Sequence, residues 1–201
     1  MRKWLIPLIT IVVVIFGVYS WLKNFNNKAV VLQEDAKTTW SNVESAYQRR
    51  NDLIGNLVKT VQGAADFEKE TLTQVIEARS KATSTTIDAN NLTPENMAQF
   101  QQAQTGLNSA LSKMLLVVER YPDLKANANF LELQSQLEGT ENRINVARDR
   151  FNEGVNNYNK FIKVFPNSML AGMFNFSEMN RYKSNPGSEN APNVNFDFNK
   201  K

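Results

Sequence analysis

An uninterrupted apolar run at residues 5–22 (LIPLITIVVVIFGVYSWL) constrains this chain more than any other feature. It contains no charged side chain, and as a helix it would extend about 27 Å, close to the hydrocarbon thickness of a bilayer. Pro7 falls in the first turn, where proline removes little from a helix. The run is longer than the apolar core of a cleaved signal peptide. We therefore predict an uncleaved, single-pass transmembrane anchor over residues 1–23, in contact with membrane lipid.

The charges that flank the run predict its orientation. Arg2 and Lys3 precede it without a nearby acid, whereas the lysines that follow it are accompanied by Glu34 and Asp35. The positive-inside rule then places the amino terminus in the cytoplasm and the rest of the chain outside it. The two sides of the run carry nearly equal numbers of basic residues, so the predicted orientation depends on Glu34 and Asp35, which offset the lysines after the run.

The composition excludes several kinds of chemistry. Among the 201 residues there is no cysteine and no histidine. Zinc sites of the Cys/His type, thiol nucleophiles, Ser-His-Asp triads and histidine bases are therefore absent. The net charge of +3 is small, and the charged residues of both signs are interspersed, which does not favour nucleic acid as a partner. We expect a protein that is not an enzyme, with no catalytic residues, no cofactor, no metal and no small-molecule substrate.

Between residues 29 and 165 proline and glycine are scarce, and apolar residues recur at helical spacing. We predict helices at residues 28–62 and 66–83, a third from the Thr93-Pro94 start to Tyr121, and a fourth that begins at Asp123 or Asn127 and ends before Pro166. The first could continue the anchor, or bend at Gly63 into the second. The fold expected for residues 24–166 is all-α: an antiparallel up-and-down four-helix bundle with two long and two shorter helices. The predicted inward positions include Trp40, Tyr47, Ile54, Leu72, Val75, Ile76, Phe100, Leu107, Phe130, Ile144, Phe151, Ile162 and Phe165.

In this topology the two long helices both extend back towards the anchor, so the segment after Pro166 comes near the bilayer. Residues 167–176 (NSMLAGMFNF) are apolar and aromatic. They either lie in the membrane interface or fold back onto the bundle. From residue 177 to 201 the chain is polar and broken by proline and glycine, which predicts disorder. The candidate membrane-interface residues are Met169, Leu170, Met173, Phe174 and Phe176.

Three charged residues fall on or beside the predicted apolar faces. Arg50 lies between Tyr47 and Ile54, Arg79 follows the apolar positions of the second helix, and Glu141 belongs to the fourth. Counted from the far end of the bundle, the three lie within roughly 7 Å of one another in height. They are candidates for one buried polar layer. A pair that fixes the register of the helices is the favoured interpretation, and a binding or relay site is the alternative.

Two other polar groups suggest surface interactions. Residues 156–159 (NNYN) offer hydrogen-bonding side chains, although caps and solvated faces explain most such asparagines. Arg143, Arg148 and Arg150, together with Arg49, form a basic group that would suit an acidic partner or would simply be exposed.

Several ordered segments together resemble the LemA family of bacterial membrane-anchored proteins. They include residues 40–43 (WSNV), 67–72 (FEKETL), 121–127 (YPDLKAN) and 140–144 (TENRI). The resemblance extends from about residue 29 to residue 176. It implies an amino-terminal transmembrane helix followed by an antiparallel four-helix domain, and it supplies no catalytic residues.

This chain departs from the family pattern at two positions. Gly55 stands where the family often has proline, so a kink there would be softened, and Phe151 stands where tyrosine is frequent. The family is commonly described with its domain inside the cell, opposite to the orientation that the flanking charges predict here.

The expected function is that of a non-enzymatic, membrane-tethered interaction or scaffold module of the bacterial envelope, held in the inner (cytoplasmic) membrane. Its partner would be a membrane or envelope protein, or further copies of itself. Alternatives are an accessory subunit of a membrane protease or transporter, or a self-assembling membrane oligomer. The anchor contains no small-xxx-small motif that would favour assembly.

Overall fold

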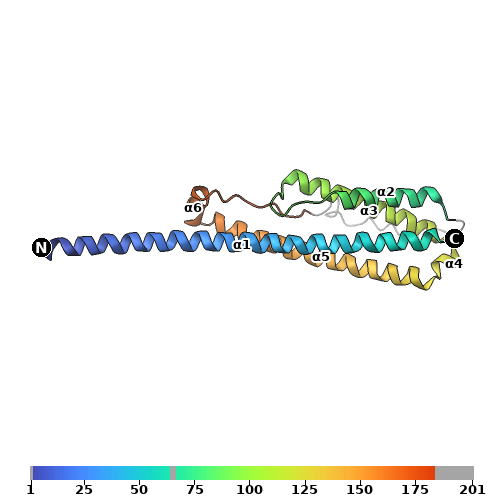
Figure 1. Cartoon of the computed structure of the whole chain (residues 1–201), viewed down its shortest axis with the longest axis horizontal. Helices are drawn as coiled ribbons and strands as arrows, with labels where there is room; N and C mark the ends of the chain where they lie inside the picture. Colours follow the sequence, from blue (N-terminus) through green and yellow to red (C-terminus); the bar gives the residue numbers. More distant parts are fainter. Residues whose placement is uncertain (1, 64–66, 184–201) are drawn as a thin grey trace, which may run out of the picture.

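The computed structural model describes residues 2–63 and 67–183, with side chains from residue 5 onward, and in this part of the chain all regular structure is helical. The prediction of an all-α fold with a long apolar helix at its amino terminus is confirmed (Figure 1). The helices are α1 (Arg2–Gln62), α2 (Lys69–Ser84), α3 (Pro94–Val118), α4 (Pro122–Lys125), α5 (Ala128–Lys163) and α6 (Asn167–Met173).

Helix α1 runs for 61 residues without a break, so the apolar run and the first helix of the domain are one rigid element. Within the described residues it is the one helix whose length and composition suit a membrane crossing. Its large apolar side chains are exposed from Leu5 to Trp21, and Phe25, at 3% exposure, is the first that is buried. The change from exposed to buried apolar residues marks the point where the helical domain begins.

The domain is built from helix pairs. Helix α5 packs along α1, α2 packs along α3, and α2 also packs against α1 (Figure 1). Gly154 allows a close approach of α5 to α1, because a Cβ atom there would lie 3.3 Å from the Cα atom of Ala36. The buried apolar residues form three clusters along α1, at the membrane-proximal base, in the middle and at the far end. Their largest members include Phe25, Tyr158, Ile162, Trp40, Phe151, Ile144, Ile54, Leu57, Leu107 and Met114.

Local signals in the sequence start the helices as expected. The Thr93 side chain accepts a hydrogen bond from the Asn96 amide at 3.2 Å, ahead of Pro94 in the first turn of α3. Asn127 caps α5, where its side-chain oxygen accepts from two backbone amides at 3.0 and 3.2 Å. Asp123, the other predicted start, lies in α4, a separate single turn.

Two expectations about α2 need correction. The helix begins at Lys69 rather than near residue 66, which lies outside the described residues. Ile76 was predicted to face inward but is 44% exposed, whereas Val75 is fully buried. Adjacent helical residues point about 100° apart, so a narrow interface with α1 and α3 buries only one of them.

The segment after α5 turns back at the base. Leu170 is 4% exposed and joins the base cluster, and Phe176 packs against Phe25 with ring centroids 5.9 Å apart. In contrast, Met169 and Met173 are 66% and 70% exposed, and Phe165, which was predicted to face inward, is 75% exposed because α5 ends before it, at Lys163. One side of α6 therefore packs back onto the domain, and its other side is exposed.

Residues 177–183 were expected to be disordered, and that expectation is wrong for this stretch. They follow α6 without regular structure (Figure 1). The side chains of Asn152 and Asn159 on α5 bind their backbone. The polar composition predicted disorder, because a prediction based on hydrophobic residues takes no account of side-chain amides that can bind and order a polar segment. The remainder of the predicted disordered tail, residues 184–201, lies outside the described residues.

Candidate functional site

A polar network connects three helices in the middle of the domain. Arg50, on α1, is only 3% exposed. Its Nη1 atom donates to Asn108 Oδ1 at 3.0 Å and to Glu141 Oε2 at 3.3 Å, and its Nη2 atom donates to Gln104 Oε1. The guanidinium also lies 4.8 Å from the ring centroid of Tyr47. Arg50 therefore joins α1 to α3 and α5, although its Nε atom is buried without a hydrogen-bond partner in the described part.

The Arg50–Glu141 ion pair is only partly removed from water, because the Glu141 side chain is 46% exposed. The pair lies at one end of a cavity of about 400 Å³ between α3 and α5. The walls of the cavity include Leu111, Leu115 and Leu137. The site thus has a charged end and an apolar wall, a combination that suits binding more than proton transfer.

Arg79 lies apart from this pair. Its Nε atom donates to the backbone carbonyl oxygen of Asn51 at 2.7 Å, and none of the described hydrogen bonds or ion pairs connects it to Glu141. Its guanidinium covers Gly55, where an added Cβ atom would approach Arg79 Cζ to 3.0 Å. The structure therefore brings together two of the three candidates for a polar layer and places the third against the backbone of α1.

The sequence analysis missed the two amides that accept from Arg50. Gln104 is 3% exposed and stands between Phe100 and Leu107, four and three residues away on the inward face of α3. Asn108 follows one turn later. The available signal was an uncharged polar residue, Gln104, at an inward position of α3.

A second cavity, of about 600 Å³, lies between α1 and α5 and is basic. Arg49, Arg143 and Arg150 line it, and Val146 within it is 49% exposed. None of these arginines takes part in an ion pair among the described residues. Arg148 faces elsewhere, since its guanidinium lies 4.1 Å from the ring centroid of Tyr182.

Titratable groups do not converge as they would at a catalytic centre. Burial raises the pKa of the Tyr47 phenol, which shares a 2.8 Å hydrogen bond with the Tyr182 hydroxyl. Burial also raises the pKa of Tyr158, whose hydroxyl donates to the Ser177 carbonyl at 2.9 Å. The part of the chain that the structure describes contains no group of three acidic side chains arranged to hold a metal ion.

The exposed apolar start of α1 is compatible with a single-pass membrane anchor, and the helical domain is built on its continuation; together these are the features of a membrane-associated helical protein. Residues 39–196 match the LemA family, and the chain belongs to this family.

Curated relatives lie at moderate distance. The chain is similar to magnetosome protein MamQ of Magnetospirillum gryphiswaldense, 26% identical over 184 residues that cover 81% of this chain and 66% of that protein. MamQ 2 of Paramagnetospirillum magneticum is 25% identical with the same coverage. Protein LemA of Metamycoplasma hominis is 26% identical over 140 residues, which cover 69% of this chain and 60% of the relative. The chain thus spans about two thirds or less of the length of these relatives.

Proposed function

We propose that this protein is a membrane-tethered, non-enzymatic interaction or scaffold module of the bacterial envelope. The observation that carries this proposal is the continuity of α1, which forms both the apolar anchor and one wall of the domain core. Because a single helix without a loop joins them, the domain follows the height and tilt of the anchor in the bilayer. The long helices then form an antiparallel bundle that stands on the membrane and presents its sides to partners.

The base of the domain rests on the lipid surface in this proposal. Phe25, three residues beyond the apolar run, stacks with Phe161 at a centroid separation of 5.5 Å. At the same end of the domain, Phe165, Met169 and Met173 are 75%, 66% and 70% exposed. Exposed aromatic and apolar side chains at the exit of a membrane helix suit the interfacial region of a bilayer.

A fluorescent label tests this contact. The chain has no cysteine, so a single Met173→Cys substitution gives a unique attachment site for an environment-sensitive dye. In lipid nanodiscs we expect its emission to be shifted to the blue. The matched control is Leu116→Cys at the far end of α3, where the native side chain is 72% exposed, and it should report water. Equal emission at the two positions would show that the base does not touch lipid.

The basic cavity between α1 and α5 is the surface that we assign to a protein partner. Three arginines line it together with the exposed apolar side chain of Val146, and they have no acidic partners among the described ion pairs. An acidic segment with an apolar residue at its centre would complement this surface in charge and shape.

Affinity purification after in-cell crosslinking tests the assignment, with the tag placed after Lys201. The wild-type chain should recover one membrane or envelope complex, and the charge reversal of Arg49, Arg143 and Arg150 to glutamate should lose it. The control reverses three exposed lysines on α2 and α3, namely Lys69, Lys81 and Lys113, and so changes the net charge equally. Loss of the complex in both variants would refute the assigned surface. Recovery of the protein alone, in multiples, would favour the self-assembling oligomer.

The extracytoplasmic orientation is proposed from the charges that flank the anchor. In intact spheroplasts, the Leu116→Cys variant should react with a membrane-impermeant maleimide. Reaction only after the membrane is opened would place the domain in the cytoplasm.

A further inference from the structure

Residues 177–183 form a strap that occupies a groove between α5 and the amino-terminal end of α3. The strap leaves the base of the domain after α6 and runs back along the helices (Figure 1). It is antiparallel to α5, because Tyr158 binds the Ser177 carbonyl and Asn152, further towards the start of α5, binds Tyr182. On its other side, Gln101 of α3 donates to the Lys183 carbonyl at 3.2 Å. The strap is therefore held from two helices.

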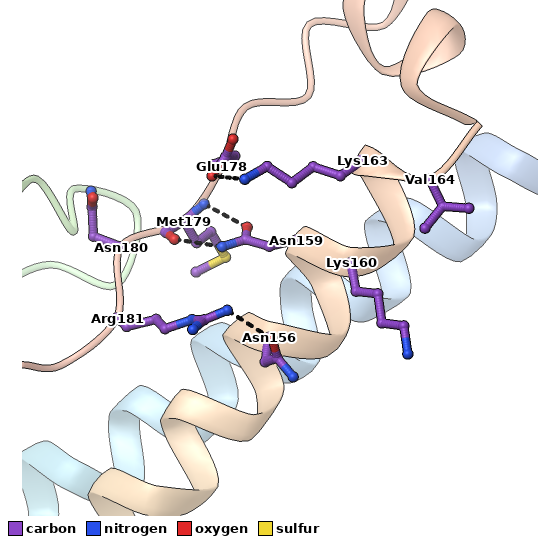
Figure 2. A pocket seen from close by; sticks show the side chains of 9 residues that line it. All are labelled: Asn156, Asn159, Lys160, Lys163, Val164, Glu178, Met179, Asn180 and Arg181. Atoms are coloured by element: carbon purple, nitrogen blue, oxygen red, sulfur yellow. Dashed lines mark hydrogen bonds and ion pairs between the residues drawn. The ribbon is translucent and has the colours of Figure 1, made fainter. Parts of the chain in front are cut away.

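Two asparagines of α5 bind the main chain of the strap in the same way. Asn159 donates to the Met179 carbonyl at 2.8 Å and accepts from the Met179 amide at 2.9 Å (Figure 2). Asn152 donates to the Tyr182 carbonyl at 3.0 Å and accepts from the Tyr182 amide at 2.8 Å. Each side-chain amide thus satisfies both backbone groups of one strap residue.

The spacing of these contacts fits both the rise of the α5 helix and the rise of an extended strap. Asn152 and Asn159 are two helical turns apart, about 10.5 Å along the axis of α5. Met179 and Tyr182 are three residues apart, which is about 10 Å in an extended chain. An extended backbone therefore stays in register with the helix over this distance. Because every peptide has these backbone groups, the asparagines recognise an extended main chain and not a particular sequence.

Selectivity comes from two strap side chains. Met179 packs against both the base and the middle core clusters. Tyr182 is 6% exposed, and its hydroxyl lies 2.8 Å from that of Tyr47 beneath the Arg148 guanidinium. The strap therefore contributes an apolar residue and, three positions later, a tyrosine to the buried contacts.

An open hollow remains beside the strap. A cavity of about 590 Å³ lies beside it, lined by α5 residues including Lys160 and by strap residues including Arg181 (Figure 2). Gln101 of α3 contacts the end of the strap at Lys183. About 10 Å further along α3, at Asn108, begins the Leu-lined cavity of about 400 Å³ between α3 and α5. The outer contacts of the strap, Lys163–Glu178 and Arg181–Asn156, are exposed and contribute little.

We propose that the α3–α5 groove is a peptide-recognition site and that the strap is its resident ligand. The exchanging occupant is an extended segment of another protein that carries an apolar residue and a tyrosine three positions apart and continues into the Leu-lined cavity. This site is separate from the basic cavity between α1 and α5, so it stands whether or not that cavity binds an acidic partner.

Peptide binding to the full chain in nanodiscs tests the proposal. The probe is a fluorescein-labelled peptide with the sequence of residues 176–183 (FSEMNRYK), and the control peptide has serine in place of the methionine and the tyrosine. The strap variant Met179→Ser/Tyr182→Ser should bind the probe at least tenfold more tightly than the wild-type chain does, because an attached strap competes at an effective concentration of order 1 mM. Adding Asn152→Leu and Asn159→Leu should abolish binding, and the control peptide should bind no variant.

A measurement on the wild-type chain keeps the proposal testable if the strap variant does not fold. Excess unlabelled probe should speed hydrogen exchange at the amides of Met179 and Tyr182, and the control peptide should leave it unchanged. Unchanged exchange with both peptides would overturn the proposal, as would equal probe binding by all variants. If the strap variant captures the strap of a second copy of the chain and not the free peptide, the occupant is that copy and our assignment of a foreign segment is wrong.

Discussion

Neutralising Glu141 should destabilise the domain by an amount set by the half-buried position of its ion pair. The perturbation is Glu141→Gln, which keeps the size of the side chain and removes its charge. Arg50, at 3% exposure, then keeps Gln104 and Asn108 as acceptors but loses its only described anionic partner.

The expected magnitude lies between two limits. Breaking a fully buried ion pair costs about 3–5 kcal/mol, whereas an exposed pair contributes about 0–1 kcal/mol. The Glu141 side chain is 46% exposed, and the two amides continue to solvate the guanidinium. We therefore expect a loss of roughly 1–2 kcal/mol, between the limits and nearer the lower one. For a domain of this size the melting temperature would fall by roughly 2–8 °C.

The assay is thermal unfolding of the full chain in detergent micelles, followed by the circular dichroism of its helices. Glu138→Gln is the matched control, because it removes the same charge one turn away on α5, and the described ion pairs do not include Glu138. A double-mutant cycle with Arg50→Met isolates the pairwise term.

Two results would refute this reasoning. One is an equal melting temperature for the Glu141→Gln and Glu138→Gln variants. The other is strict additivity in the cycle with Arg50→Met, since a real pair must give a coupling energy of about 1 kcal/mol.

Three further predictions concern packing, protonation and capping. Gly154→Ala should lower the free energy of unfolding by about 1–3 kcal/mol, because the added Cβ atom would press on the backbone of Ala36. Gly139→Ala, on the same helix but with open space around it, should raise the free energy of unfolding by about 0.5–1 kcal/mol. If denaturant unfolding gave both changes the same sign, the close approach of α5 to α1 would be contradicted. Burial raises the pKa of Tyr158, so the folded state holds a proton that the unfolded state loses above about pH 10. The contribution of the neutral Tyr158 phenol to stability is complete below that pH and disappears as the pH rises through the folded pKa. Melting temperatures should therefore fall less steeply in alkali for Tyr158→Phe, and parallel curves would argue against its burial. Asn127→Ala removes the cap of α5 and should cost about 1 kcal/mol in the same unfolding assay, and an unchanged midpoint would mean that solvent replaces the cap.

Features that depend on local pattern could be predicted from the amino-acid sequence alone. The apolar run predicted a transmembrane anchor, because the thickness of a bilayer sets the length of a helix that can cross it. Helical periodicity predicted the all-α class, and Thr93 and Asn127 marked helix starts because capping depends on a few neighbouring residues. Most inward positions followed from the same periodicity. The exceptions are Ile76, where the width of an interface decided which neighbour is buried, and Phe165, which lies beyond the end of α5.

The tertiary structure decided which distant polar groups meet. Arg50 and Glu141 lie on helices that the fold brings together, whereas Arg79 turns to the backbone near Asn51, a distinction that axial height could not make. The strap was missed because its order comes from Asn152 and Asn159 binding the backbone of residues 20 to 30 positions away along the chain. An isolated polar segment cannot compensate its conformational entropy, but a groove that pairs its backbone groups can. Local periodicity therefore gives the helices, and only their packing creates the groove and selects its occupant.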